Sequence, residues 1–233
     1  MAIGSARKSP SRNAGTQVLS HKIDLTKPYF LFSVHITVKI GVVGLQGDVS
    51  EHIDAIKEAL KKSGKKGKVI LLRHPRDVEY VDAATIPGGE STTISKLLQN
   101  SNLFDPIQKR GQDGMPILGT CAGCILLSKN AGEQAEKTKT RLLALMDMEV
   151  NRNAFGRQKA SFEAELTIEG LEHSFRGVFI RAPAIVRLWG DCKPMARFGN
   201  VIVMAKQGNL VGAAFHPELT EDTTLYEWFL NLI

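Results

Sequence analysis

From residue 38 onward, apolar runs of strand length alternate with amphipathic runs of helix length. The first apolar run, VKIGVVG, is continuous and ends at glycine, which is typical of a strand buried on both faces. Residues 48–64 follow, and they place Ile53, Ile56 and Leu60 at steps of three and four, so these side chains share one helix face. Repeated strand–helix units of this kind predict a parallel sheet with helices on both faces.

The remaining elements extend this pattern. Further strands are expected in KVILL, DAATI and MPILG, with helices over residues 91–99 and 122–129. Asp48 and Glu51 have the spacing of a capping box at the start of the first helix, whose surface would carry Glu51 and His52. After residue 141, five strand-like segments separated by short turns predict an antiparallel extension of the same sheet. The expected fold is α/β, with a mostly parallel central sheet flanked by helices, in one domain over residues 38–233.

The charge of the chain is concentrated at its amino terminus. The 233 residues carry a net charge of +6, and residues 1–39 contribute six lysines and arginines against Asp24 alone. The rest is therefore nearly neutral and does not predict a nucleic-acid-binding surface. No apolar run reaches the roughly 18 residues of a membrane helix. Three cysteines are too few, and odd in number, for a disulfide framework, so we expect a reducing, cytoplasmic setting.

Residues 1–37 form a basic segment rich in serine and arginine, which we expect to be disordered or weakly ordered. A transit peptide is one interpretation. The other is that residues 1–37 come from a translation start assigned too far upstream, because a start codon at Val38 would give a chain that begins Met-Lys-Ile. Both interpretations remain open.

The stretch PILGTCAGCILLSK contains Cys121 and Cys124 and allows two interpretations. As C-x-x-C it suggests a redox pair or half of a metal site. As G-x-C-x-G between a strand and a helix, it suggests a nucleophile on a sharp turn, where Gly119 and Gly123 permit close backbone approach. A helix amino terminus would favour the thiolate of Cys121, and the N–H of Ala122 would face an oxyanion.

Two other loops follow predicted strands. IPGGEST exposes backbone N–H groups at a glycine pair, without the Gly-Lys-Ser/Thr of a Walker motif. GAAFHPELTED provides His216 and Glu218, which could serve as a base and the group that orients it. In open α/β sheets such loops gather beyond the carboxyl ends of the strands.

Together these motifs resemble the class I glutamine amidotransferases, whose triad has the chain order Cys, His, Glu and whose fold is flavodoxin-like. The chain is most similar to the family of glutaminase subunits of pyridoxal 5'-phosphate synthase. The stretches that carry the resemblance span Ile40 to about Asp222, and they are GVVGLQGDVSEHI, PGGESTTI, GTCAG, NRNAFGRQKASFEAEL, FIRAP and AKQGNLVGAAFHPELTED.

The resemblance implies hydrolysis of L-glutamine to glutamate and ammonia through a thioester on Cys121, with His216 as acid and base and Glu218 orienting it. It assigns the oxyanion hole to Gly89 and Ala122, and it places Gln46 near that hole and the partner surface. Glutamine would be held by Gly89, Glu90, Ser91, Arg152, Ile180 and Arg181. The ammonia would pass to a (β/α)₈-barrel synthase subunit that makes vitamin B6, in a hetero-oligomer. The glutaminase subunit would need no cofactor or metal. Cys124 would pack in the core as a small hydrophobic residue.

Two alternatives from other classes remain. One is a thiol or redox-stress protein on a related cysteine-elbow fold, and the other is a non-catalytic binding subunit that has kept the scaffold. Glutaminase activity with and without a synthase subunit distinguishes among the three.

Overall fold

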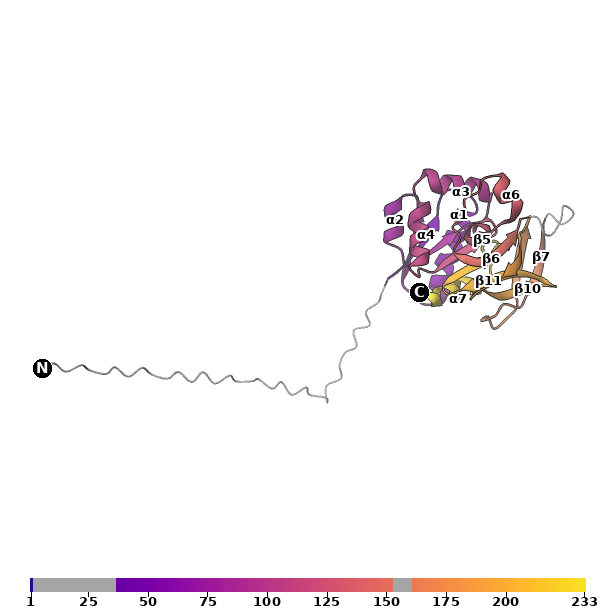
Figure 1. Ribbon diagram of the computed structural model, residues 1–233. Helices are drawn as coiled ribbons and strands as arrows, with labels where there is room; N and C mark the ends of the chain where they lie inside the picture. The colour runs from indigo at the N-terminus through magenta and orange to yellow at the C-terminus, as the bar shows by residue number, and fades with distance from the viewer. Residues whose placement is uncertain (2–36, 153–160) are drawn as a thin grey trace. The chain divides into compact units, whose positions relative to one another are not determined.

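The computed structural model describes residue 1 and residues 37–152 and 161–233 (Figure 1). The expectations for the amino-terminal segment fall on residues 2–36 and therefore lie outside the described residues.

A parallel sheet forms the first half of the fold. Its strands run in the order β2, β1, β3, β4 and β12, and each neighbouring pair is parallel. This order is that of doubly wound sheets, in which the first strand lies between the second and the third. The bounds of the strands are β1 Val38–Val43, β2 Gly67–Leu72, β3 Ala83–Ile86, β4 Ile117–Thr120 and β12 Leu210–Ala213.

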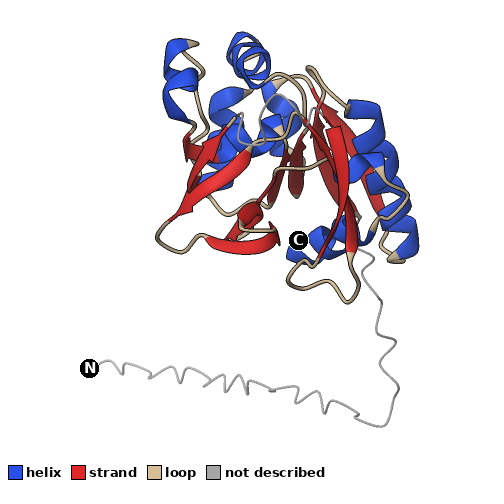
Figure 2. Ribbon diagram, turned by 90° about the vertical axis from the view of Figure 1, so that its right-hand side faces the viewer, coloured by secondary structure: helices blue, strands red, loops and turns tan. Residues whose placement is uncertain are grey.

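Helices cover both faces of this sheet (Figure 2). Val43 of β1 packs with α2, α3, α4 and α5 on one face, whereas Ile40 and Val42 pack with α1 and α7 on the other. The apolar run of β1 is thus buried on both sides, as its continuous hydrophobicity predicts. The helices are α1 Val49–Lys62, α2 Pro75–Glu79, α3 Ser91–Asn100, α4 Phe104–Gln112, α5 Ala122–Leu127, α6 Gly132–Lys137 and α7 Thr224–Phe229, with 3₁₀ turns η1 Pro217–Leu219 and η2 Leu230–Leu232.

The predicted antiparallel extension is present. Beyond β12 the sheet continues through β11, β9 and β6, which pair antiparallel, and it ends at β5, which pairs parallel with β6. A further strand, β10, pairs with β11. The bounds are β5 Ser128–Asn130, β6 Met146–Asn151, β9 Ala184–Leu188, β10 Lys193–Phe198 and β11 Val201–Gln207. The expected α/β class, mostly parallel with an antiparallel extension, is confirmed.

Two of the expected sheet strands do not join this sheet. β7 (Ser161–Leu166) and β8 (Phe175–Ile180) form a separate antiparallel pair. Phe179 stacks on Phe162 within the pair and packs against Phe215, which follows β12. The pair thus buries its aromatic side chains against the core on the α1 and α7 side. The sequence pattern shows that such strands have one buried face, but it does not show what covers that face.

The capping box predicted at the start of α1 is wrong. Asp48 occupies the cap position, but its side chain accepts no capping hydrogen bond. Its carboxylate lies instead beside His216, at the functional site described below.

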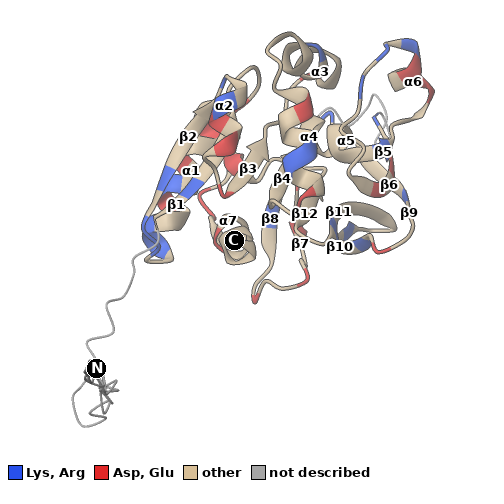
Figure 3. Cartoon of the chain, turned by 60° about the vertical axis from the view of Figure 1, so that its left-hand side comes forward, with Lys and Arg blue, Asp and Glu red and all other residues tan. Residues whose placement is uncertain are grey.

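Basic and acidic residues are interspersed over the helices, as the nearly neutral charge after residue 39 predicts (Figure 3). Within the described part of the chain, no helix combines the length and the apolar character needed to cross a membrane.

Candidate functional site

Cys121 lies on a strained elbow between β4 and α5. Its φ of 45° and ψ of −99° fall outside the regions that non-glycine residues favour. A hydrogen bond of 2.8 Å from its N–H to the carbonyl of Ala213 ties the elbow to β12. A Cβ on Gly119 would come within 2.6 Å of the Gly123 backbone, and one on Gly123 within 2.1 Å of the Ile86 carbonyl oxygen. The glycines on either side of Cys121 are therefore required by close backbone approach, as the sequence predicted.

The glycine pair after β3 borders the same site. A Cβ on Gly88 would lie 2.4 Å from Cε1 of His216, so this position has no room for a side chain. Gly89 has a φ of 132°, which favours glycine, and it faces the side chain of Gln46. The Gln46 Oε1 atom accepts a hydrogen bond of 3.2 Å from the backbone N–H of Glu90. Gln46 therefore holds the loop that carries Gly89.

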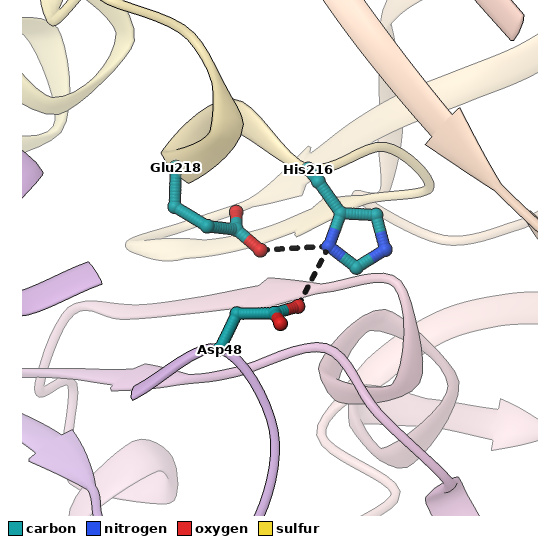
Figure 4. A group of neighbouring side chains, drawn as sticks. All are labelled: Asp48, His216 and Glu218. Atoms are coloured by element: carbon teal, nitrogen blue, oxygen red, sulfur yellow. Dashed lines mark hydrogen bonds and ion pairs between the residues drawn. The ribbon is translucent and has the colours of Figure 1, made fainter. Parts of the chain in front are cut away.

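The loop after β12 supplies His216 and Glu218, and both side chains are buried. Nδ1 of His216 lies 2.7 Å from Oε1 of Glu218 and 3.2 Å from Oδ2 of Asp48 (Figure 4). Two carboxylates from different segments thus converge on one ring nitrogen. This hydrogen bond to Glu218 fixes the Nδ1–H tautomer of the neutral ring and leaves Nε2 available as a base.

The electrostatics of His216 favour its protonated form. Burial lowers its pKa, but hydrogen bonds with Cys121 and with Glu218, together with the charges of these two groups, raise it to about 10. His216 therefore interacts with the nucleophile candidate on one side and with its orienting carboxylate on the other. The structure brings Cys121, His216 and Glu218 together, as the sequence predicted.

The predicted substrate-binding residues lie around this centre. The Glu90 carboxylate caps α3 by accepting hydrogen bonds from the N–H groups of Thr92 and Thr93, and it pairs with Nη2 of Arg152 at 3.0 Å. Burial raises the pKa of Glu90, but the hydrogen bonds from Thr93 and Thr92 lower it to about 2. Ser91 is buried, and its Oγ has no hydrogen-bond partner among the described residues.

Ile180 and Arg181 complete the predicted set on the loop after β8. The carbonyl oxygen of Ile180 lies 3.9 Å from Sγ of Cys121, while its side chain is exposed. Arg181 has a φ of 45°, a conformation that non-glycine residues rarely adopt. This loop therefore reaches Cys121, the candidate nucleophile.

Cys124 and Cys121 are not equivalent. Cys124 is fully buried, and burial raises the pKa of its thiol far above the ordinary value. A thiol in that environment is unreactive. The environment of Cys124 fits packing in the core and does not favour a C-x-x-C redox pair.

Sequence reasoning missed Asp48 as a site residue. The available signal was its position in the loop between the first buried strand and the first helix, at the edge where α/β sheets gather functional loops. Among the described residues, Asp48, His216 and Glu218 offer ligand atoms within 4.8 Å of one another, the spacing of a metal site. Their arrangement is that of a histidine held by two carboxylates, because both acidic groups contact the same Nδ1 atom.

Comparisons with known proteins match most of the chain. The model of the SNO glutamine amidotransferase family matches residues 42–233. The pyridoxal 5'-phosphate synthase subunit PdxT of Thermococcus onnurineus is 51% identical over 195 residues, which cover 83% of this chain and 98% of the relative. PdxT of Methanosarcina barkeri is 50% identical over 196 residues, which cover 84% of this chain and 98% of that relative.

Solved structures agree with the sequence relatives. A glutamine amidotransferase crystal structure superposes with a TM-score of 0.73 at 44% identity, and the match covers 83% of this chain and 97% of that one. The PurLQS structure from Thermotoga maritima matches with a TM-score of 0.55 at 15% identity, a likeness of fold alone, over 84% of this chain and 99% of that one. The expected amidotransferase-like fold is confirmed.

Proposed function

The chain belongs to the SNO glutamine amidotransferase family, and from this membership we propose that it is the glutaminase subunit of a pyridoxal 5'-phosphate synthase. The observation that carries the proposal is the meeting of Cys121, on its strained elbow, with a His216 that Glu218 orients. Residues 38–233 would form the single amidotransferase domain. The three cysteines, all free, fit the cytoplasmic location predicted from the sequence.

The reaction begins with Cys121 and His216. The Cys121 thiolate attacks the side-chain carbonyl carbon of glutamine, and the carbonyl π electrons move to oxygen. The oxyanion accepts hydrogen bonds from the N–H groups of Gly89 and Ala122. The protonated His216 then gives its proton to the leaving nitrogen, the C–N bond breaks, and ammonia departs from a thioester.

The second half returns the enzyme to its starting state. Neutral His216 takes a proton from water as that water attacks the thioester carbonyl carbon. The C–S bond breaks, the thiolate is restored beside a protonated His216, and the γ-carboxyl group of the product gives its remaining proton to solvent as glutamate leaves. Glu218 keeps its charge throughout, and it stabilises the imidazolium through Nδ1.

Glutamine is held through its charged groups. Its α-carboxylate is complementary to Arg152 and Arg181, and its α-ammonium is complementary to Glu90, through charge-assisted hydrogen bonds. Ser91, whose buried Oγ lacks a partner among the described residues, and Ile180, beside the nucleophile, line the same site. Gln46 positions the oxyanion loop and borders the surface for the synthase subunit, a (β/α)₈ barrel that receives the ammonia.

The test is ammonia and glutamate release from glutamine, with and without the synthase subunit of the same organism. The Cys121→Ala variant is expected to abolish release and to retain complex formation, measured by size-exclusion chromatography. Cys124→Ala is the matched control, and it is expected to retain most of the activity. Wild-type rates in Cys121→Ala would refute the mechanism, and loss of activity only in Cys124→Ala would favour the redox alternative. An inactive wild-type complex that still assembles would indicate the non-catalytic binding subunit.

A further inference from the structure

His52 is a second histidine behind the Cys121–His216–Glu218 centre. The sequence placed it on the surface of the first helix, but the structure buries it completely, so that expectation is wrong. Its Nδ1 atom lies 2.8 Å from the hydroxyl of Tyr226 on α7. Its Nε2 atom lies 3.1 Å from Oγ1 of Thr120 and 3.4 Å from Oε2 of Glu218. A buried chain of polar groups thus connects α7 and α1 to the carboxylate that orients His216.

The two oxygens of Glu218 have different surroundings. Oε1 accepts from His216, whereas Oε2 is buried and has no hydrogen-bond partner among the described residues. His52 Nε2 lies 3.4 Å from Oε2. A lone pair on that nitrogen would repel the carboxylate, so the geometry assigns a proton to Nε2, which donates it to Oγ1 of Thr120. Nδ1 is then the acceptor, and the Tyr226 hydroxyl is the donor.

The charges around His52 keep it neutral. Burial lowers its pKa most strongly, Glu218, Asp48 and Glu51 raise it, and protonated His216 lowers it further. The net result is a lowered pKa, so the ring is uncharged at neutral pH. Burial also raises the pKa of Tyr226 well above its ordinary value, so that residue remains a phenol. His52 can therefore hold Glu218 without neutralising the charge that His216 needs.

On the premise of the glutaminase function proposed above, we propose that His52 is a positioning residue of the reaction and that Tyr226 sets its tautomer. The proton on His52 Nε2, which hydrogen-bonds Oγ1 of Thr120 at 3.1 Å, also lies beside Oε2 of Glu218 at 3.4 Å, and this electrostatic contact keeps Oε1 on His216 Nδ1. His216 in turn stays aligned with Cys121. Neither His52 nor Tyr226 touches the substrate or the reacting atoms.

The test combines kinetics of the complex with NMR of the full chain. Tyr226→Phe removes only the hydroxyl, and it is expected to lower kcat about tenfold with KM for glutamine nearly unchanged, by analogy with the outer hydrogen-bond partners of metal-binding histidines. With Glu218 less well fixed, the pKa of His216, measured by ¹⁵N-histidine NMR in both proteins, is expected to be lower in Tyr226→Phe than in the wild type. His52→Gln, which can keep an N–H near Nε2, is expected to retain more kcat than His52→Leu.

Ser128→Ala is the matched control, because it removes a buried hydroxyl hydrogen bond of 2.7 Å elsewhere in the fold. It is expected to lower thermal stability and leave kcat and the His216 titration unchanged. If Tyr226→Phe also lowers thermal stability but leaves kcat and the His216 titration unchanged, the role of His52 is only structural and the inference is wrong. The inference also fails if the ¹⁵N shifts of wild-type His52 place its proton on Nδ1. If the wild-type complex releases no ammonia, the proposed function fails, and the NMR measurements still decide the inference.

Discussion

Gly88→Ala tests how tightly the glycine loop fits against the imidazole of His216, the proposed acid and base. The added Cβ would lie 2.4 Å from Cε1 of His216 and 3.0 Å from its Nδ1, where ordinary contacts begin at 3.4 Å. The ring must therefore retreat by about 1 Å. Gly88 does not have a positive φ, so the backbone itself tolerates alanine. His216 is buried, which prevents the ring from swinging into solvent to relieve the overlap.

The size of the effect follows from this displacement. A misplacement of about 1 Å in a catalytic constellation costs on the order of 10²-fold in rate, which corresponds to about 2.7 kcal/mol of transition-state stabilisation. We expect kcat to fall by that factor. The hydrogen bonds that raise the pKa of His216 to about 10 would also weaken, so its pKa should fall toward the ordinary 6.5.

The assay is ammonia release by the complex, with a parallel ¹⁵N titration of His216. Gly44→Ala is the matched control, because its Cβ would lie equally close, 2.4 Å, to Cδ1 of Leu71 and 2.5 Å from its Cγ, so the overlap falls on an apolar side chain of β2 and not on His216. The control is expected to keep its kcat. A Gly88→Ala complex with kcat within about threefold of wild type, and an unchanged His216 pKa, would refute the reasoning.

Three further predictions concern charge and accessibility at the site. Iodoacetamide should modify Cys121 but not Cys124, because burial raises the pKa of the Cys124 thiol. Peptide mass spectrometry checks this, and modified Cys124 in the folded chain would contradict it. The pKa of Glu90, about 2, lies below the ordinary 4.5, so its charge stabilises the fold above pH 4.5, and this stabilisation is lost as the pH falls toward 2. Glu90→Gln should flatten that part of the stability curve in denaturant titrations, and an unaltered curve would contradict this. Asp48→Asn should lower the pKa of His216, measured by ¹⁵N NMR, because it removes a carboxylate 3.2 Å from Nδ1; an unchanged pKa would show that this contact is inert.

The elements predicted best from the sequence are those whose pattern is local. β1 and α1 were identified because a continuous apolar run and a three-to-four-residue periodicity each specify one structure. α4 was not identified, since its sequence FDPIQKRGQ contains Pro106 and Gly111, both poor helix formers. Packing of Phe104 and Ile107 into the core explains why this segment is nevertheless helical. Tertiary contacts of this kind are not visible in local propensity.

The separation of β7 and β8 from the main sheet also depends on tertiary contacts that the local sequence does not show. Alternating burial along a strand shows that one face is covered, but the covering surface comes from distant segments, here the core around Phe215. The cysteine, histidine and glutamate of the site could be predicted because each follows an apolar strand, and parallel strands bring their carboxyl ends to one edge.

The two residues that the sequence assigned wrongly, Asp48 and His52, share a physical cause. Both were assigned from the local pattern of α1, as a cap and as a surface residue, yet both side chains contact the loop after β12. A local signal for His52 was present, because it lies four and eight residues before Ile56 and Leu60 and so shares their buried face. A polar side chain on that face must find a hydrogen-bond partner inside the protein. The pattern therefore indicates a buried polar contact, and only the fold identifies its partners as Glu218 and Tyr226.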